Sequence, residues 1–157
     1  MLKRKKIVNE IHHTEKHYVK VLEILNDLFY TPLKNKQNGI VTLEETKVIF
    51  SGVEGLKICN LSLLEQISNR VSEWNKNNQL GDIFLSLAPY FKMYITYIST
   101  YQQRIDKLNE ILKREEVRNW FNVNIFLFNF IFINFIFILF LFYFYFIFIL
   151  FLFNFKF

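Results

Sequence analysis

The 157-residue chain divides by composition into a mixed, charged part and a strongly apolar part. Residues 1–118 hold 18 basic and 14 acidic side chains, a net charge of +4, and Lys156 is the only charged residue after Arg118. This mild positive charge excludes a strongly basic nucleic-acid-binding surface. Cys59 is the sole cysteine, which excludes an internal disulfide and a cysteine-rich zinc site and predicts a small buried apolar residue.

A run of four basic residues, Lys3 to Lys6, lies at the start of the chain. We interpret it as the solvated beginning of a helix, and a nuclear signal or a phospholipid-facing patch are the alternatives. Polar residues follow almost at once, from Asn9 to His13, so the run lacks the apolar segment of a secretory signal peptide. This part of the chain is therefore predicted to be cytoplasmic.

The first predicted helix has apolar or small residues at alternating spacings of four and three, the pattern of a helix that buries one face. They are Ile7, Ile11, Thr14, Tyr18, Val21, Leu25 and Leu28. We expect this helix to end near Tyr30, because Pro32 restricts Thr31 away from the helical region. The polar run at residues 34–39 is then a loop.

A second helix is predicted to begin at Thr42, because Thr42 and Glu45 have the spacing of a capping box. Its apolar pattern continues to Val71, and Gly52 and Gly55 are positions where the helix could bend.

A loop at residues 75–81 precedes a third helical pattern, from Asp82 to Leu112, which Pro89 is expected to kink or restart. The sequence therefore predicts an all-α fold, an elongated bundle of long amphipathic helices.

Three stretches of this bundle resemble the Dbl homology (RhoGEF) domain. The segment from Glu10 to Leu22, followed by the segment from Tyr30 to Leu33, resembles the first conserved helix of that family, in which a glutamate, Thr-Glu and Tyr-Val precede Pro-Leu. Residues 48–56 and 81–97 resemble the next segments in the expected order. The resemblance covers about residues 4–114, and we predict that residues 1–116 form a partial Dbl homology domain.

The resemblance implies that the chain promotes GDP release from a Rho-family small GTPase. Such factors act by binding the nucleotide-free form more tightly, so no covalent step, cofactor or metal is expected. Glu15 takes the place of the family's glutamate that binds switch I, and Glu10 and Tyr18 are further candidates for GTPase binding. Glu15 follows Ile11 by four residues and precedes Tyr18 by three, which predicts a carboxylate at the edge of the apolar stripe, within reach of a partner. The same stripe predicts a core position for Tyr18.

The third conserved helix of the family, with its Lys-Pro-x-Gln-Arg and Tyr-Pro-Leu-Leu patterns, has no counterpart in these 157 residues. Pro32 and Pro89 are the only prolines, and neither lies in that context. The pleckstrin homology domain that usually follows would not fit either. We therefore expect a truncated domain with weak or absent exchange activity.

Residues 117–157 form a tail rich in Phe, Ile and Leu, and 16 of the 20 Phe residues lie after Asn119. Residues 125–153 carry no charge, which is longer than the roughly 20 residues that cross a bilayer as a helix. One interpretation is a C-terminal membrane anchor, which would make the chain a membrane-anchored helical interaction protein without catalysis. Phe, however, alternates with other residues, and the small residues of membrane helices are missing. The second interpretation is therefore a translated, A/T-rich non-coding stretch.

His13 and His17 have the spacing that places two imidazoles on one helical face, as a zinc site would need. No Glu or Cys completes the set of ligands, and we expect no metal.

Overall fold

The computed structural model describes residues 2–35, 39–74 and 79–122. Every regular element in these ranges is a helix, as predicted. The chain divides into two compact units, residues 1–120 and 121–157, and Phe121 and Asn122 are the only residues of the second unit that are described. The predicted hydrophobic C-terminal helix lies outside the described residues. Within the described ranges, no helix has both the length and the apolar character needed to cross a membrane.

The first helical run is longer than predicted. Helix α1 (Leu2–Ile24) continues into a π-helical segment, η1 (Leu25–Tyr30), and then into α2 (Thr31–Lys34). Pro32 does not end the run because it lies in the first turn of α2, where the missing proline N–H leaves no interior helical bond unmade. The expectation of a helix end near Tyr30 is therefore wrong by one turn.

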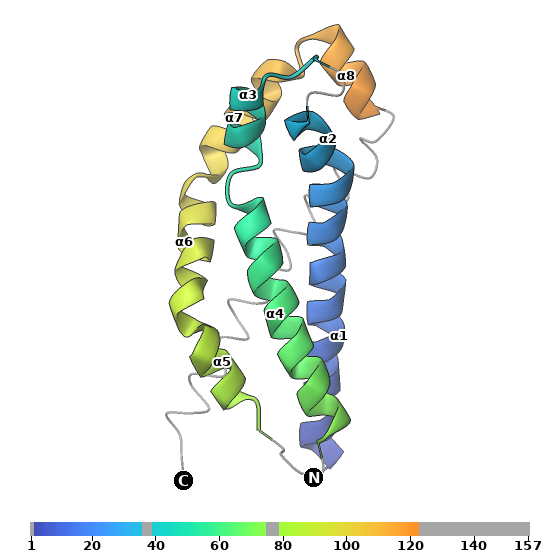
Figure 1. Ribbon diagram of the computed structural model, residues 1–157, viewed down its shortest axis with the longest axis vertical. Coiled ribbons are helices and arrows are strands. Elements are labelled where there is room, and N and C mark those ends of the chain that lie inside the picture. The colour runs from blue at the N-terminus through green and yellow to red at the C-terminus, as the bar shows by residue number, and fades with distance from the viewer. Residues whose placement is uncertain (1, 36–38, 75–78, 123–157) are drawn as a thin grey trace. The chain divides into compact units, whose positions relative to one another are not determined.

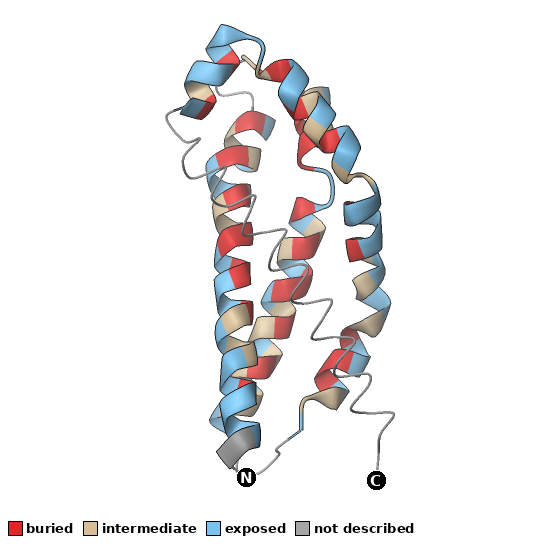
Figure 2. Cartoon of the chain, turned by 180° about the vertical axis from the view of Figure 1, so that it is seen from behind, coloured by how far each residue is buried: buried red, intermediate tan, exposed pale blue. Residues whose placement is uncertain are grey.

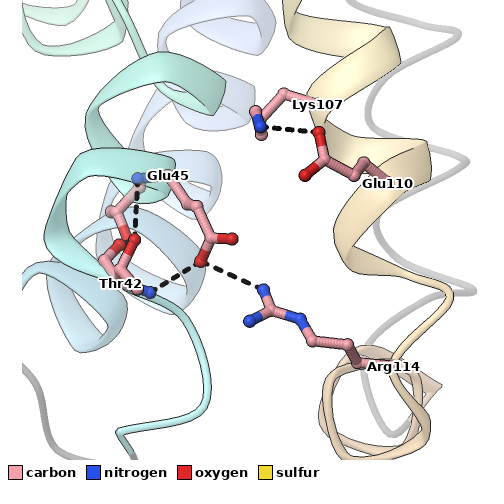
Figure 3. A network of polar contacts seen from close by, with 6 residues as sticks. Thr42, Glu45, Lys107, Glu110 and Arg114 are labelled. Carbon is pink, nitrogen blue, oxygen red and sulfur yellow. Dashed lines mark hydrogen bonds and ion pairs between the residues drawn. The ribbon is translucent and has the colours of Figure 1, made fainter.

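Helix α3 (Leu43–Ile49) begins with the predicted capping box. The backbone N–H of Glu45 donates to Thr42 Oγ1 at 3.1 Å, and the backbone N–H of Thr42 donates to Glu45 Oε2 at 2.8 Å. The same carboxylate accepts a hydrogen bond from Arg114 Nη2 at 3.0 Å, which Figure 3 shows beside the pair of Lys107 and Glu110. The cap therefore also ties the start of α3 to a residue 69 positions later.

Gly52 separates α3 from α4 (Val53–Ser72), so the single bent helix that the pattern predicted is two helices. Its φ of 83° lies in the left-handed region, which a residue without Cβ adopts at little cost. Gly55 lies inside α4 and does not interrupt it.

The third helical pattern is divided more often than the sequence predicted. Helix α5 (Gly81–Leu87) is followed by a 3-10 segment, η2 (Ala88–Phe91), at Pro89, and then by α6 (Lys92–Ser99). The expected restart at Pro89 is confirmed. A further break at Thr100 leads into α7 (Tyr101–Ile111), and a turn leads from there into α8 (Glu115–Asn122). The break at Thr100 was not predicted, while the turn after α7 follows the predicted end of the pattern at Leu112.

Helices α1 and α4 lie side by side and run in opposite directions, and α5 and α6 return along α4 (Figure 1). The buried residues of α1 lie on the side that faces α4 (Figure 2). A hydrogen bond of 2.9 Å joins His12 Nε2 on α1 to Ser68 Oγ on α4. Arg70 at the end of α4 binds both carboxylate oxygens of Asp82 on α5, at 2.8 and 2.6 Å. These contacts fix α1 and α5 on α4.

Candidate functional site

Glu15 is the residue that the family resemblance placed at the centre of the site. It lies on α1 with 4% of its surface exposed, and its Oε1 atom has no hydrogen-bond partner. The expected accessible carboxylate at the edge of the stripe is therefore wrong in this structure. The reason is geometric: Glu15 is three residues before Tyr18 and seven before Leu22, so all three lie on the buried face of α1.

Burial changes the chemistry of this carboxyl group. Loss of water around it disfavours the charged form and raises the pKa of Glu15 from 4.5 to about 8. The group is consequently mostly protonated at pH 7. An isolated buried carboxylate would be far more costly, and neutralisation is the usual response of such a group.

The groups around Glu15 come from three helices. Tyr18 lies on α1, Cys59 on α4 and Tyr94 on α6, and all three are buried. Burial raises the pKa of each of them, and the neighbouring Glu15 carboxyl raises it further. Two phenols and a thiol that stay neutral offer Glu15 no counter-charge. The buried surroundings of Glu15 therefore favour the protonated acid.

Asn60 joins α4 to α6 beneath this cluster. The Tyr94 hydroxyl donates to Asn60 Oδ1 at 2.6 Å, and Asn60 Nδ2 donates to the carbonyl of Leu56 at 2.7 Å. Asn60 is fully buried. Our sequence analysis did not select it, although its place four residues after Leu56 and three before Leu63 puts it on the buried stripe. A polar residue at such a position is a detectable signal, because buried amides need partners.

The three candidate residues do not form one surface. Tyr18 is buried, as its place in the stripe predicted, with 1% of its surface exposed. Glu10 is exposed. Five residues separate Glu10 from Glu15, and this spacing turns the helix by about 140° beyond a full turn, so the two acids point to different sides of α1. Glu10 and Glu15 therefore cannot bind one partner group together.

Arg104 on α7 is a second buried ionisable residue that the sequence did not reveal. Its guanidinium lies 3.7 Å from the centre of the Tyr97 ring and donates to Thr100 Oγ1 at 2.6 Å and to the Tyr97 carbonyl. These contacts fill the break between α6 and α7. We interpret Arg104 as a structural residue, because its two terminal nitrogens bind Thr100 and Tyr97 at that break, while its buried Nε has no hydrogen-bond partner.

Metal binding finds no support in the described ranges. His13 and His17 are both exposed on α1, and no group of three or more His, Cys, Asp or Glu residues lies close enough to hold a metal ion there.

Comparison with known proteins identifies the family. The model of the RhoGEF domain matches residues 7–124, so the chain belongs to the RhoGEF (Dbl homology) family. The resemblance found in the sequence is thereby confirmed.

Named relatives include proteins of two organisms. The chain is 32% identical to the Myosin-M heavy chain of Dictyostelium discoideum over 74% of its own length and 6% of that protein. It is 32% identical to FYVE, RhoGEF and PH domain-containing protein 4 of Homo sapiens, over 69% of its own length and 14% of that protein. The Rac guanine nucleotide exchange factor JJ of Dictyostelium discoideum is 26% identical over 78% of this chain and 10% of that protein. The chain thus spans a small fraction of these relatives, and no solved structure matches it.

Proposed function

We propose that this chain binds a Rho-family small GTPase in its nucleotide-free form and promotes nucleotide exchange only weakly. Family membership supports the GTPase as partner, and two relatives carry exchange factor or RhoGEF in their names. Exchange of this kind is differential binding of one protein to two states of another. It needs interfaces on the helices and no covalent chemistry.

The burial of Glu15 is the observation that supports weak activity. A glutamate that binds switch I has to reach the partner and carry its charge, and here it does neither at pH 7. Ionising a group with a pKa of about 8 at pH 7 costs about 1.4 kcal/mol, a factor of about ten in population. Uncovering the buried side chain also requires the packing of α1 against α4 to open, which adds to this cost. Complexes in which Glu15 contacts the GTPase are therefore rare as long as the helices stay packed around this residue.

Glu10 and Tyr18 have different parts in this proposal. Glu10 is exposed without any movement, so it can contact a partner that approaches that side of α1. Tyr18 reaches a partner only if the helices around it separate, because it is almost completely buried. We accordingly propose Glu10 as an initial contact and Glu15 as a contact of the opened state.

The experiment measures GTPase binding and nucleotide release separately. The purified chain is incubated with representative Rho and Rac GTPases, either loaded with GDP or stripped of nucleotide with EDTA, and retention is compared. Release of a fluorescent GDP analogue is followed in parallel. We expect preferential retention of the nucleotide-free form and less than tenfold acceleration of release.

Variants locate the contact. Glu15→Ala is expected to abolish the preference for the nucleotide-free form, while Glu65→Ala, on the exposed side of α4, is the matched control and should behave as the parent chain. Equal retention of both GTPase forms by the parent chain would contradict the proposed function. Acceleration of a hundredfold or more would contradict the weak activity. Retention on neutral vesicles without any GTPase binding would instead favour the membrane-anchored interaction protein.

A further inference from the structure

The outer face of α1 carries a row of basic side chains. Helical geometry of about 100° per residue places them within a sector of roughly 120°. They are Lys5, Lys6, His13, Lys16, His17 and Lys20, all exposed, and we name them the α1 basic stripe. The buried residues Val8, Glu15 and Leu22 lie on the opposite side of the helix.

Acidic residues border the stripe but do not interrupt it. Glu10 lies just beyond one edge of the sector, and Glu23 lies at its C-terminal end, where it pairs with Lys20 at 3.3 Å. None of the ion pairs among the described residues includes Lys5, Lys6 or Lys16. Within the described part of the chain, these three lysines of the stripe therefore have no acidic side chain in an ion pair with them.

The neighbouring helix leaves this face open. Helix α4 contacts the other side of α1, and His12, which bonds to Ser68, marks the flank of that contact. The outer edge of α1 is coloured as exposed along most of its length (Figure 2). Lys5 and Lys20 are separated by 15 residues of continuous α-helix, a straight distance of about 22 Å. The stripe is therefore long and flat.

We propose that the α1 basic stripe binds the surface of a membrane that contains anionic lipids. A flat, straight row of flexible ammonium groups suits a plane of mobile phosphate and carboxylate headgroups, which needs no pocket and no fixed geometry. The stripe contains no Phe, Tyr or Trp ring on which bases could stack and no arginine for paired recognition of phosphate or guanine, which argues against a nucleic acid. No large apolar residue lies in its centre, so the binding is electrostatic and does not insert.

This surface is separate from the proposed GTPase contact at Glu15, and Glu10, the proposed initial contact, lies at its edge. The centre of the stripe lies about 140° around α1 from Glu15. One protein can therefore hold a headgroup surface on one side of α1 and a GTPase on the other. The inference does not depend on exchange activity, and either proposal can fail alone.

The test measures binding of the whole chain to vesicles of phosphatidylcholine alone and of phosphatidylcholine with 30% phosphatidylserine, at 0.1 M salt. The first composition records all binding that does not depend on lipid charge. The gain in affinity with phosphatidylserine is the readout. Each lysine close to such a surface contributes about fivefold, so Lys5→Gln, Lys6→Gln and Lys16→Gln together are expected to lower the gain by roughly 100-fold. Salt at 0.5 M should remove the gain from the parent chain.

A triple variant of equal charge is the control. Lys47→Gln, Lys92→Gln and Lys113→Gln remove three exposed lysines from other helices and turns, and the gain should change less than twofold. Equal losses in the two triple variants would overturn the proposal, because net charge rather than the stripe would then account for binding. Absence of any gain with phosphatidylserine would overturn it too. The proposal would also be overturned if the chain bound single-stranded RNA as tightly as vesicles and lost that binding in the stripe variant.

Discussion

Substitution of Glu15 by glutamine tests the interpretation of the buried acid directly. The amide has nearly the same shape as the protonated carboxyl group but cannot ionise. In the parent chain the pKa of Glu15 is about 8 in the folded state and about 4.5 when the chain unfolds. The folded state therefore binds more protons than the unfolded state between these two values, and stability is lost as pH rises through that window.

The size of the effect follows from the same two values. Within this pH window, each pH unit lowers the free energy of unfolding of the parent chain by about 1.4 kcal/mol, and the variant does not show this loss. Glu15→Gln should gain about 0.4 kcal/mol relative to the parent between pH 4.5 and 5, where Glu15 of the unfolded chain is only partly ionised, and about 3 kcal/mol in total by pH 7. Above pH 8 the difference between the two proteins should become constant.

Urea unfolding followed by circular dichroism at pH 5, 6, 7 and 8 measures this difference. A difference in the free energy of unfolding that is the same at every pH reports how well the amide packs. Only the change of this difference with pH reports ionisation. Glu65→Gln, at an exposed position on α4, should show no slope relative to the parent. A difference between Glu15→Gln and the parent that stays within 0.5 kcal/mol from pH 5 to pH 8 would show that Glu15 is ionised in the folded protein, and the reasoning would be refuted.

Three further substitutions test other contacts, each by urea unfolding at pH 7. Tyr94→Phe leaves Asn60 Oδ1 without its donor inside the core and should cost about 1–3 kcal/mol, and a neutral result would mean that water replaces the hydroxyl. Gly52→Ala forces a side chain into left-handed backbone with its Cβ 3.2 Å from the Tyr97 ring, which should cost about 1–2 kcal/mol; a stabilised variant would contradict the strain. Glu45→Ala removes one half of a capping box and should cost about 1 kcal/mol, unless α3 is held by packing alone.

Local patterns in the sequence predicted the helices and several of their boundaries. The capping box at Thr42 and the restart at Pro89 depend on residues within a few positions of each other, so they could be predicted from the chain, whereas Gly52 was predicted only as a possible bend. The continuation of the helix through Pro32 could not be predicted in this way, because the π-helical segment before it depends on packing. The break at Thr100 depends on polar contacts of Arg104 with Thr100 and Tyr97, four and seven residues before it, which the apolar pattern does not indicate.

The candidate site was predicted in part. The family resemblance identified the domain, and the apolar stripe placed Tyr18 correctly in the core. The sequence placed Glu15 at the edge of the apolar stripe, but its spacing alone did not distinguish an edge position from a buried one. That distinction depends on Cys59 and Tyr94, which α4 and α6 bring to it from more than 40 residues away. The periodicity of α1 alone therefore could not predict that Glu15 is buried.

The neutral state of Glu15 links any opening of the helices to acidity in the surrounding solution. When the side chain meets water at pH 7 its pKa returns toward 4.5, and about one proton leaves the protein. A partner that uncovers the group would therefore release hydrogen ions as it docks. The heat of that association would then vary with the ionisation enthalpy of the buffer, and calorimetry in phosphate and in Tris would give different values for the same complex.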